Sequence, residues 1–411
     1  MSVVAIAIAW LLASTAILAL TYRRTFLAAW REPVLSAPVL IVESDDWGYG
    51  PPGQARELDR IADVLADFRD AAGRHPVATL GVVLAGPDTL RMREEGCRSY
   101  RRLTLGDGPL APVREAMLRG AARGVFALQL HAMEHFWPAS LLRSAKDDVA
   151  VREWLTQPAL ASTEDLPSPL QSRWVDASVL PSRPLPEDEA VAAATDETRA
   201  FASLLGSAAE VVVPTTFVWN DAVEGAWLRA GVKVVVTPGV RNEARDTGGR
   251  IVAGERTYFN AQRGPNGGIY VVRDAYFEPS LGQDHGHALA ALSARTLGGR
   301  PTLLEMHRMN FMGDPAATQH ALDELSKLMK AALAAFPSLR FMSTVELARE
   351  YGGRSALVEK RAGTRLHYLI RRVAEVSRLR KLAWLTGAAL PAWLAYVATR
   401  PAARRLAESA A

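Results

Sequence analysis

The stretch VLIVESDDWGYG, residues 39–50, places a run of four apolar residues directly before the acidic residues Glu43, Asp45 and Asp46. An unbroken apolar run of this kind predicts a strand that is buried on both faces, as in a parallel sheet. Two adjacent carboxylates at the end of such a strand repel each other unless a cation, a proton or water relieves the charge. The stretch therefore predicts a buried strand that leads into a site with charged chemistry.

Seven further apolar runs resemble this strand, and helical patterns lie between them. Buried strands separated by helices indicate a parallel sheet covered on both faces, and seven or eight such units predict one irregular (β/α) barrel over residues 34–352. The predicted strands are 38–43, 77–83, 125–130, 210–216, 232–237, 268–273, 301–306 and 339–343. The predicted helices are 53–72, 111–123, 187–206, 221–230, 285–297 and 315–335. Residues 140–187, rich in Pro, Ser and charge, predict a long insertion.

The overall composition is that of a globular protein. Of the 411 residues, 49% are hydrophobic and 22% are charged, and the formal net charge is only +4. The single cysteine, Cys97, excludes an internal disulfide, so the fold must depend on its core. Nothing resembles a phosphate-binding glycine loop or a nucleic-acid-binding module, and we expect no nucleic-acid partner.

The N-terminus carries a candidate membrane anchor over residues 1–22. Residues 3–20 are uncharged and mostly apolar, and as a helix they would extend about 27 Å, just enough to span a bilayer core. No Lys or Arg precedes this run and no small-x-small cleavage pattern closes it, so we expect an uncleaved anchor rather than a signal peptide. Arg23, Arg24 and Arg31 follow the run, which favours a cytoplasmic position for the rest of the chain, although the side of the inner or plasma membrane stays open.

The C-terminal residues 359–411 repeat this pattern. Residues 359–381 predict a basic amphipathic helix, and residues 382–399 form a second apolar run. Pro391 in the middle of that run predicts a kinked span or an interfacial hairpin, and the basic flanks suit anionic lipid headgroups. The alternative is a helix that packs on the domain itself. Membrane lipids are the expected partners of this tail.

The segment HAMEH, residues 131–135, places His131 and His135 four residues apart. On a helical turn this spacing brings both imidazoles to one face, where they can share a metal ion. The segment follows a predicted strand, as Asp45 and Asp46 do, and the C-terminal ends of parallel strands meet at one rim of a barrel. Two imidazoles and one carboxylate make a site for Zn²⁺ or a similar divalent ion, with positions left for water and substrate.

Two further polar residues end predicted strands at the same rim. Asp274 follows GIYVVR and His307 follows PTLLEM. A second carboxylate beside the metal would take a proton from water, and a histidine on the far side would protonate a leaving group. Such an arrangement suits the hydrolysis of an amide or an ester.

Three short motifs, in this order along the chain, resemble those of the polysaccharide deacetylase (NodB-like) family, whose fold is a distorted (β/α) barrel. The motifs are ESDDWG at 43–48, HAMEH at 131–135 and LLEMH at 303–307.

The resemblance implies a role for each matching residue. It implies that Asp45 is the catalytic base and that Asp46 binds the metal together with His131 and His135. It also implies that His307 is the general acid. The expected activity is the metal-dependent removal of N- or O-acetyl groups from an amino-sugar glycan or glycolipid, such as a lipid-linked or surface-bound saccharide. The expected cofactor is a divalent metal, Zn²⁺ first.

The sequence departs from the family pattern in several places. Trp47 lies between the acidic pair and Gly48, and Ser44 stands where the family usually has an aromatic residue. Ala132 replaces the usual Ser or Thr, and the last motif has one residue more than the family's Leu-x-His.

The family's Arg-x-Pro segment, whose arginine orients the base, has only VVPTTFVWND as a candidate, with Val212 where the arginine belongs. Asp274 is a candidate for the acid that tunes the catalytic histidine, although a structural role is expected for it. Trp219 in the same segment would either stack against a sugar ring or serve as packing.

Two other functions stay open. A membrane-anchored glycan-binding protein or scaffold would keep the fold without the chemistry, and the missing Arg-x-Pro motif favours it. HAMEH also fits the inverted zinc-protease signature, with Glu134 as the base and Glu210 as a distant third ligand. That interpretation requires a helix around both histidines, and it leaves Asp45 and His307 without a role.

Overall fold

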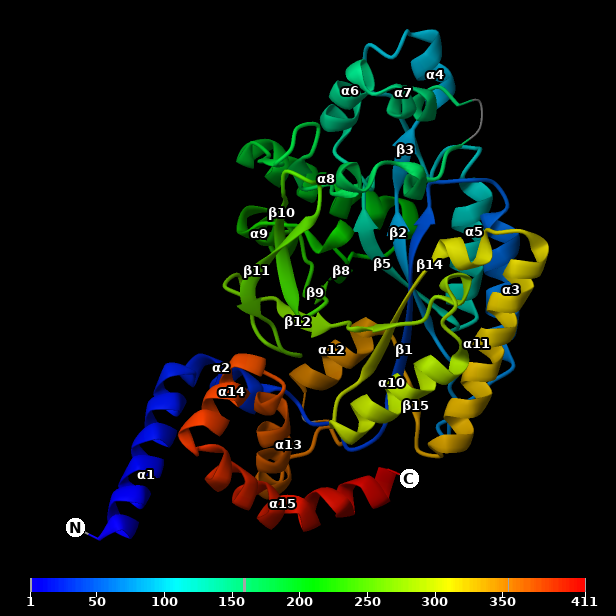
Figure 1. Ribbon diagram of the computed structural model, residues 1–411. Coiled ribbons are helices and arrows are strands. Elements are labelled where there is room, and N and C mark those ends of the chain that lie inside the picture. The colour runs from blue at the N-terminus through cyan, green and yellow to red at the C-terminus, as the bar shows by residue number, and fades with distance from the viewer. Residues whose placement is uncertain (1, 158–159, 354, 411) are drawn as a thin grey trace.

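The computed structural model describes residues 2–157, 160–353 and 355–410, and for residues 401–410 the backbone alone. Figure 1 shows a central sheet with helices around it, a group of short elements at one end, and a group of helices at the other end. Both chain termini lie at the end with the group of helices.

The central sheet is an open, irregular (β/α) barrel, which confirms the predicted fold class. Its strands pair in the order β12-β9-β8-β5-β2-β1-β14-β13, with β15 beside β1, and all of these pairs are parallel. This order follows the chain around the barrel, and among the described strands no ladder joins β12 to β13. The strands are β1 (Val39–Gly48), β2 (Ala78–Val83), β5 (Phe126–Ala132), β8 (Val211–Val212), β9 (Val234–Thr237), β12 (Ile269–Val272), β13 (Ala275–Tyr276), β14 (Thr302–His307) and β15 (Arg340–Phe341).

All of the predicted strands are present in this sheet. The strand β13 was not predicted, because a two-residue strand leaves no recognisable apolar run. The predicted first strand ends at residue 43, whereas β1 continues through the acidic residues to Gly48. It continues because β2 and β14 pair with it on both sides beyond Glu43.

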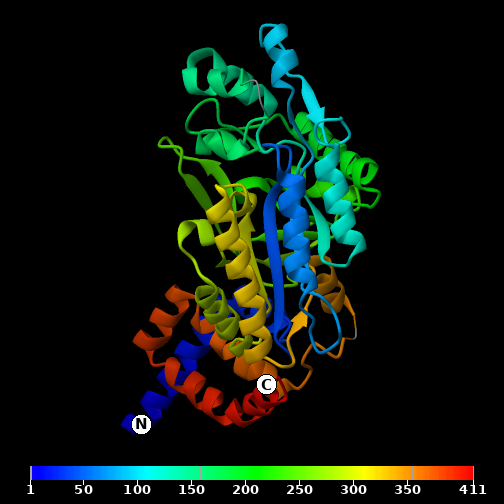
Figure 2. The ribbon, with the colours of Figure 1, turned by 90° about the vertical axis from the view of Figure 1, so that its right-hand side faces the viewer.

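The predicted helices cover the outside of the sheet, and Figure 2 shows α3 and α11 side by side along it. Apolar side chains of α3 such as Leu58, Ile61 and Leu65 are buried against the sheet. The prediction for α3 was too long, because the Asp70 carboxylate accepts hydrogen bonds from the backbone N–H groups of Ala72 and Arg74 and forms a loop there. The predicted helices are α3 (Gln54–Ala66), α5 (Ala111–Ala122), α8 (Glu187–Leu205), α9 (Asp221–Arg229), α10 (His285–Leu297) and α11 (Pro315–Ala335). A further helix, α12 (Thr344–Gly352), was not predicted.

Short elements beyond the C-terminal ends of the strands form a small core of their own. The region predicted as an insertion, 140–187, supplies most of them, and its residues 158–159 lie outside the described part. The elements are α4 (Thr89–Glu94), α6 (Pro138–Asp147), α7 (Val149–Leu155), η1 (Thr163–Asp165), η2 (Ser168–Gln171) and the pair β6 (Val175–Asp176) and β7 (Arg183–Pro184). Two further antiparallel pairs were not predicted from the sequence: β3 (Ala85–Pro87) with β4 (Arg102–Thr104), and β10 (Val240–Arg245) with β11 (Ile251–Thr257).

The interior of the barrel changes character along the strands. Alternate residues of a strand face one side, so Val39 and Ile41 of β1 join an apolar cluster with α12 at the N-terminal end of the barrel. Glu43 and Asp45 follow on the same side of β1, and they lie level with Glu305 and His307 of β14. The interior is therefore apolar at one end and charged at the end where the strands finish.

A group of helices covers the N-terminal ends of the strands (Figure 1). We call it the helical base; it comprises α1 (Val3–Thr21), α2 (Arg23–Arg31), α13 (Ala362–Ala374), α14 (Ser377–Thr386) and α15 (Ala389–Ala410). An ion pair joins the helical base to the barrel. It forms between Arg300, just before β14, and Glu375. Among the described residues, α1 is the one helix that is by itself long and apolar enough to cross a membrane.

The predicted kink at Pro391 is wrong in position. The C-terminal apolar run breaks between α14 and α15, which meet at an angle of 107°. Gly387 carries the break with a φ of 81°, which glycine adopts without strain. Pro391 lies in the first turn of α15, where a helix loses little from the missing N–H of proline. From residue 401 onward, the side chains of the predicted basic tail lie outside the described part.

Candidate metal and acid–base site

A bulge in β1 turns two successive carboxylates toward the same region. In a regular strand, Asp45 and Asp46 would point to opposite faces of the sheet. The register of β1 against β2 shifts between Ser44 and Trp47, and Asp46 adopts a φ of 71°, in the left-handed region that is costly for a residue with a side chain. Such backbone strain is concentrated at functional sites.

Asp46 meets both histidines of the HAMEH segment. Its Oδ1 lies 3.3 Å from Nε2 of His131 and 3.3 Å from Nε2 of His135, and all three side chains are buried. The Nδ1 of His131 lies 2.7 Å from the carbonyl oxygen of Val213, to which it donates if that nitrogen carries the proton. This bond directs Nε2 toward Asp46.

These three residues fit a divalent metal ion. Their ligand atoms lie within 4.8 Å of one another, and Asp46 Oδ1 is buried without a hydrogen-bond partner among the described residues. Neighbouring ligands about 2.0–2.1 Å from a tetrahedral Zn²⁺ are about 3.3–3.4 Å apart, which agrees with both Asp46–histidine distances. Burial, opposed in part by Asp46, lowers the pKa of His135 to about 4, so this imidazole is in the neutral form that binds a metal.

Asp45 does not join this group and is held by an arginine instead. Its Oδ2 accepts a hydrogen bond from Nη2 of Arg273 at 2.7 Å. Its Oδ1 is buried without a hydrogen-bond partner in the described part of the chain, and it faces Gly81 of β2 so closely that a Cβ there would lie 2.2 Å away. Burial alone would raise the pKa of Asp45, but the charges of Arg273 and His131 outweigh it and lower that pKa. Asp45 is therefore an ionised carboxylate with one free oxygen.

Arg273 follows β12 and lies inside the barrel among three carboxylates. It contacts Glu43 at 2.9 Å and Glu305 at 3.1 Å, in addition to Asp45. One guanidinium cannot neutralise three buried carboxylates, and burial raises the pKa of Glu43 and of Glu305 against the opposing charge of Arg273. The structure thus supplies an arginine at Asp45 from β12, although Val212 stands in the segment where the family pattern has one.

His307, at the end of β14, is the register partner of Asp45 in β1, so their side chains are neighbours. Its Nδ1 lies 2.6 Å from Oε1 of Glu278, and 30% of its side chain is exposed. Burial lowers the pKa of His307, but the bond to Glu278 and the charge of Asp46 outweigh it and raise that pKa to about 10. An imidazolium at neutral pH is able to donate a proton.

The candidate role of Asp274 in tuning the histidine is wrong, and the expected structural role fits the geometry. Asp274 pairs with Arg295 of α10 at 2.8 Å. Glu278 occupies the position beside His307 instead, and it also accepts a hydrogen bond from the side chain of Asn310.

Trp219 is part of the core and not of a sugar-binding surface. Its side chain is 2% exposed and its Nε1 donates a hydrogen bond to Glu224 at 3.0 Å. The expectation that it stacks against a sugar ring is wrong, because protein atoms cover the indole. The packing role that the sequence left open is the one observed.

The inverted zinc-protease interpretation is wrong as well. The residues of HAMEH form the end of β5 and a turn, not a helix. Glu134 is fully buried and its Oε2 accepts a hydrogen bond from Arg173 at 2.6 Å, so it is committed to an ion pair. Glu210 precedes β8, at the opposite end of the barrel, and pairs with Lys233.

Replacing Glu278 with glutamine is expected to shift the basic limb of the pH–rate profile to lower pH. Activity that depends on proton donation by the imidazolium of His307 is lost as the pH rises through its pKa, and that pKa falls when the neighbouring carboxylate becomes neutral. The limb is measured as kcat/KM against pH for both proteins. An unchanged limb would show that Glu278 does not tune the acid.

The raised pKa also has a consequence for stability. Because the folded-state pKa of His307 lies above the unfolded value of 6.5, its stabilising contribution is complete below pH 6.5 and is lost as the pH rises toward 10. Glu278→Gln is expected to weaken this pH dependence without removing it, because the charges of Asp46 and Asp45 still raise the pKa of His307.

Three residues of the site were missed at the level of the sequence: Gly81, Arg273 and Glu278. Arg273 is the last residue of the predicted strand 268–273, directly before Asp274. Its position at the end of a strand therefore indicated that it lies near the site. Glu278 lies in a loop after β13, and only the pairing of β13 with β14 brings it beside His307. Gly81 lies within an apolar strand, where a glycine indicates a close approach of another group.

Comparison with known proteins finds no matching family model and no matching curated protein. Among solved structures, a putative polysaccharide deacetylase from Mycobacterium smegmatis is similar over 80% of this chain and 99% of its own, with 11% identity and a TM-score of 0.38. A family 4 carbohydrate esterase from Streptomyces lividans in complex with acetate is similar over 74% of this chain and 90% of its own, with 11% identity and a TM-score of 0.32.

A 4-alpha-glucanotransferase from Thermococcus litoralis is similar over 84% of this chain, with 10% identity and a TM-score of 0.40. This chain covers only 46% of the length of that enzyme.

Proposed function

We propose that the protein is a metal-dependent hydrolase that removes acetyl groups from an amino-sugar glycan or glycolipid. The observation that carries the proposal is the division of the two adjacent carboxylates. Asp46 lies with His131 and His135 in a group that fits a metal, while Asp45 is held apart by Arg273 with one oxygen free. A base, a metal group and a proton donor within one barrel rim suit the cleavage of an amide or an ester.

A divalent ion held by the three ligands would polarise the acetyl carbonyl and lower the pKa of water. The free Oδ1 of Asp45 takes a proton from the water that attacks the carbonyl carbon, and Arg273 keeps this carboxylate ionised and oriented. When the carbon–nitrogen bond breaks, the imidazolium of His307 donates its proton to the departing nitrogen. The products are acetate and a free amino group, and Glu278 supports His307 in both protonation states.

The position of Arg273 bears on the alternative of a non-catalytic scaffold. That alternative depended on the missing Arg-x-Pro arginine. Because Arg273 contacts Asp45 at 2.7 Å, the proposed catalytic base has an orienting partner after all. The proposal of an active hydrolase is therefore preferred.

The location of the site favours a polymeric or extended substrate. His307 lies at the C-terminal end of β14, whereas the helical base packs at the N-terminal ends of the strands (Figure 1). If the helical base attaches the protein to an inner or plasma membrane, the site faces away from that membrane. A saccharide that extends from a surface or a lipid carrier would reach it.

Chelation is expected to abolish acetate release, and Zn²⁺ is expected to restore it. The measurement uses the full chain with N-acetylglucosamine oligomers and, separately, an O-acetylated glycan, together with metal analysis. About one ion per chain is expected, and it is lost in His135→Ala, because removal of one of three protein ligands leaves an incomplete site.

His287→Ala is the matched control, because His287 is an exposed histidine near the start of α10. A well-folded chain that binds no divalent ion would contradict the proposal. Bound metal without acetate release from either class of glycan would leave the metal site standing and overturn the proposed substrate class.

A further inference from the structure

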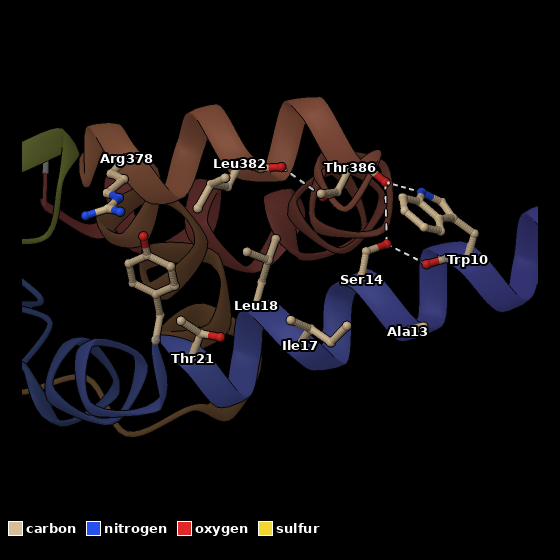
Figure 3. Close-up of a pocket in the computed structure, with 10 residues that line it drawn as sticks. Trp10, Ala13, Ser14, Ile17, Leu18, Thr21, Arg378, Leu382 and Thr386 are labelled. Atoms are coloured by element: carbon tan, nitrogen blue, oxygen red, sulfur yellow. Dashed lines mark hydrogen bonds between the residues drawn. The ribbon is translucent and has the colours of Figure 1, made fainter.

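A groove of about 610 Å³ lies in the helical base between α1 and α14 (Figure 3). Ala13, Ile17 and Leu18 of α1 and Leu382 of α14 contribute its apolar walls. Figure 3 shows Arg378 toward one end of the groove and Trp10 toward the other. The volume lies within the range of about 300–1,000 Å³ that is usual for ligand sites.

The two helices that form the groove are joined by side chains of α1. Trp10 Nε1 donates a hydrogen bond to the carbonyl oxygen of Thr386 at 3.0 Å, and Ser14 Oγ lies 3.4 Å from the same oxygen. Thr386 is the last residue of α14, and the carbonyl groups at a helix end lack partners within the helix. In apolar surroundings such a carbonyl needs a donor from elsewhere, and α1 supplies it.

The helices α1 and α14 also approach each other closely at Gly387, where α14 ends. A Cβ on Gly387 would lie 2.8 Å from Leu11, so the glycine that ends α14 also makes room for α1. The N-terminal helix is therefore part of the folded helical base. This contact favours an uncleaved anchor over a signal peptide.

The outer surface of the same helices is apolar and exposed. Leu12 and Leu20 of α1 are 67% and 69% exposed, and Trp384 and Leu385 of α14 are 74% and 83% exposed. Large apolar side chains gathered on adjoining helices indicate a surface that contacts lipid. The groove opens within this surface, so acyl chains are the apolar molecules that would reach it.

The end of the groove at Arg378 is positively charged. Arg378 is exposed and has no ion-pair partner among the described residues, and the same holds for Arg23 and Arg24, which follow the groove residue Tyr22. The 19 residues of α1 extend about 28 Å, close to the thickness of a bilayer core of about 30 Å. Arg378 would thus lie at the level of the lipid headgroups.

We propose that this groove binds one acyl chain of an anionic phospholipid, with the lipid phosphate beside Arg378. The apolar walls match the chain, and the unpaired cation matches the charge of the headgroup. The proposal does not depend on the function assigned to the metal site. It assigns the helical base a specific lipid in addition to its general contact with a membrane.

The test measures lipid bound to the full chain in mild detergent by native mass spectrometry. Phosphatidylglycerol and phosphatidylcholine are titrated separately. We expect one phosphatidylglycerol to stay bound at concentrations where phosphatidylcholine dissociates. We expect Arg378→Gln to reduce the binding constant for phosphatidylglycerol about fivefold, since a charged contact near the headgroup contributes about 1 kcal/mol. Ala13→Phe, which fills the groove, is expected to exclude the lipid.

Arg380→Gln is the matched control, because Arg380 is exposed on the same helix, lacks an ion pair among the described residues and does not line the groove. Equal losses in Arg378→Gln and Arg380→Gln would overturn the proposal in favour of general attraction to charged lipid. Equal binding of both lipids, or no retained lipid, would also overturn it. The thermal unfolding midpoint of each variant reports whether the barrel remains folded.

Discussion

Replacing Asp45 with asparagine is expected to lower the rate of acetate release by about 10²–10⁴-fold, the usual contribution of a general base. Asparagine has nearly the same shape, but its amide cannot accept the proton of the attacking water. The metal is expected to stay bound, because Asp46, His131 and His135 make up the ligand group and Asp45 is directed to Arg273. The measurement combines kcat with the metal content of the purified protein.

Asp63→Asn is the matched control for this variant. Asp63 lies on α3 with 73% of its side chain exposed, in a surface ion pair with Arg123, and its replacement is expected to leave kcat unchanged. Full activity in Asp45→Asn would show that another group is the base. Loss of the metal in that variant would show that Asp45 is a ligand.

Replacing Arg273 with glutamine is expected to lower the free energy of unfolding by about 3–5 kcal/mol, the usual effect of removing one partner of a buried ion pair. Glu43, Asp45 and Glu305 would remain together in the barrel interior without a cation among them. The measurement is denaturant unfolding of the metal-bound full chain, followed by kcat of the folded variant. Activity is expected to fall as well, because Asp45 loses its orienting partner.

The pH dependence of this variant gives a further check. The pKa values of Glu43 and Glu305 are already raised by burial, and they rise further without the guanidinium. A carboxyl group with a raised folded-state pKa stabilises the fold at low pH and loses that contribution as the pH increases. The deficit in stability is therefore expected to shrink as the pH falls toward 4.5.

Arg295→Gln is the control for the loss of an arginine in an ion pair. Arg295 and Asp274 are 24% and 33% exposed, so this pair is partly solvated and its removal is expected to cost no more than about 1 kcal/mol. Equal losses of stability in the two arginine variants would contradict the special position of Arg273 in the barrel interior.

The positions of the strands could be predicted from the sequence because burial leaves a local record. Apolar runs such as VLIV before Glu43 occur where a strand is covered on both faces, and each predicted strand is found in the sheet. The rim where Asp45, His131 and His307 gather could be predicted too, because parallel strands share one direction. The bulge that turns the side chain of Asp46 toward the same rim as Asp45 could not be predicted, since it arises from the pairing of β1 with its neighbours.

The barrel, the membrane-like helix at the start of the chain and the residue types at the strand ends could be predicted, because each depends on neighbours a few positions away. Which distant residues meet follows from the tertiary structure alone. Arg273 reaches Asp45 across 228 positions, and Trp10 reaches Thr386 across 376. Such contacts leave no periodicity in the sequence, because their partners are brought together by the curvature of the sheet and by the packing of its two ends. The bulge in β1 separates Asp45 from Asp46 in chemical role, although they are adjacent in the chain.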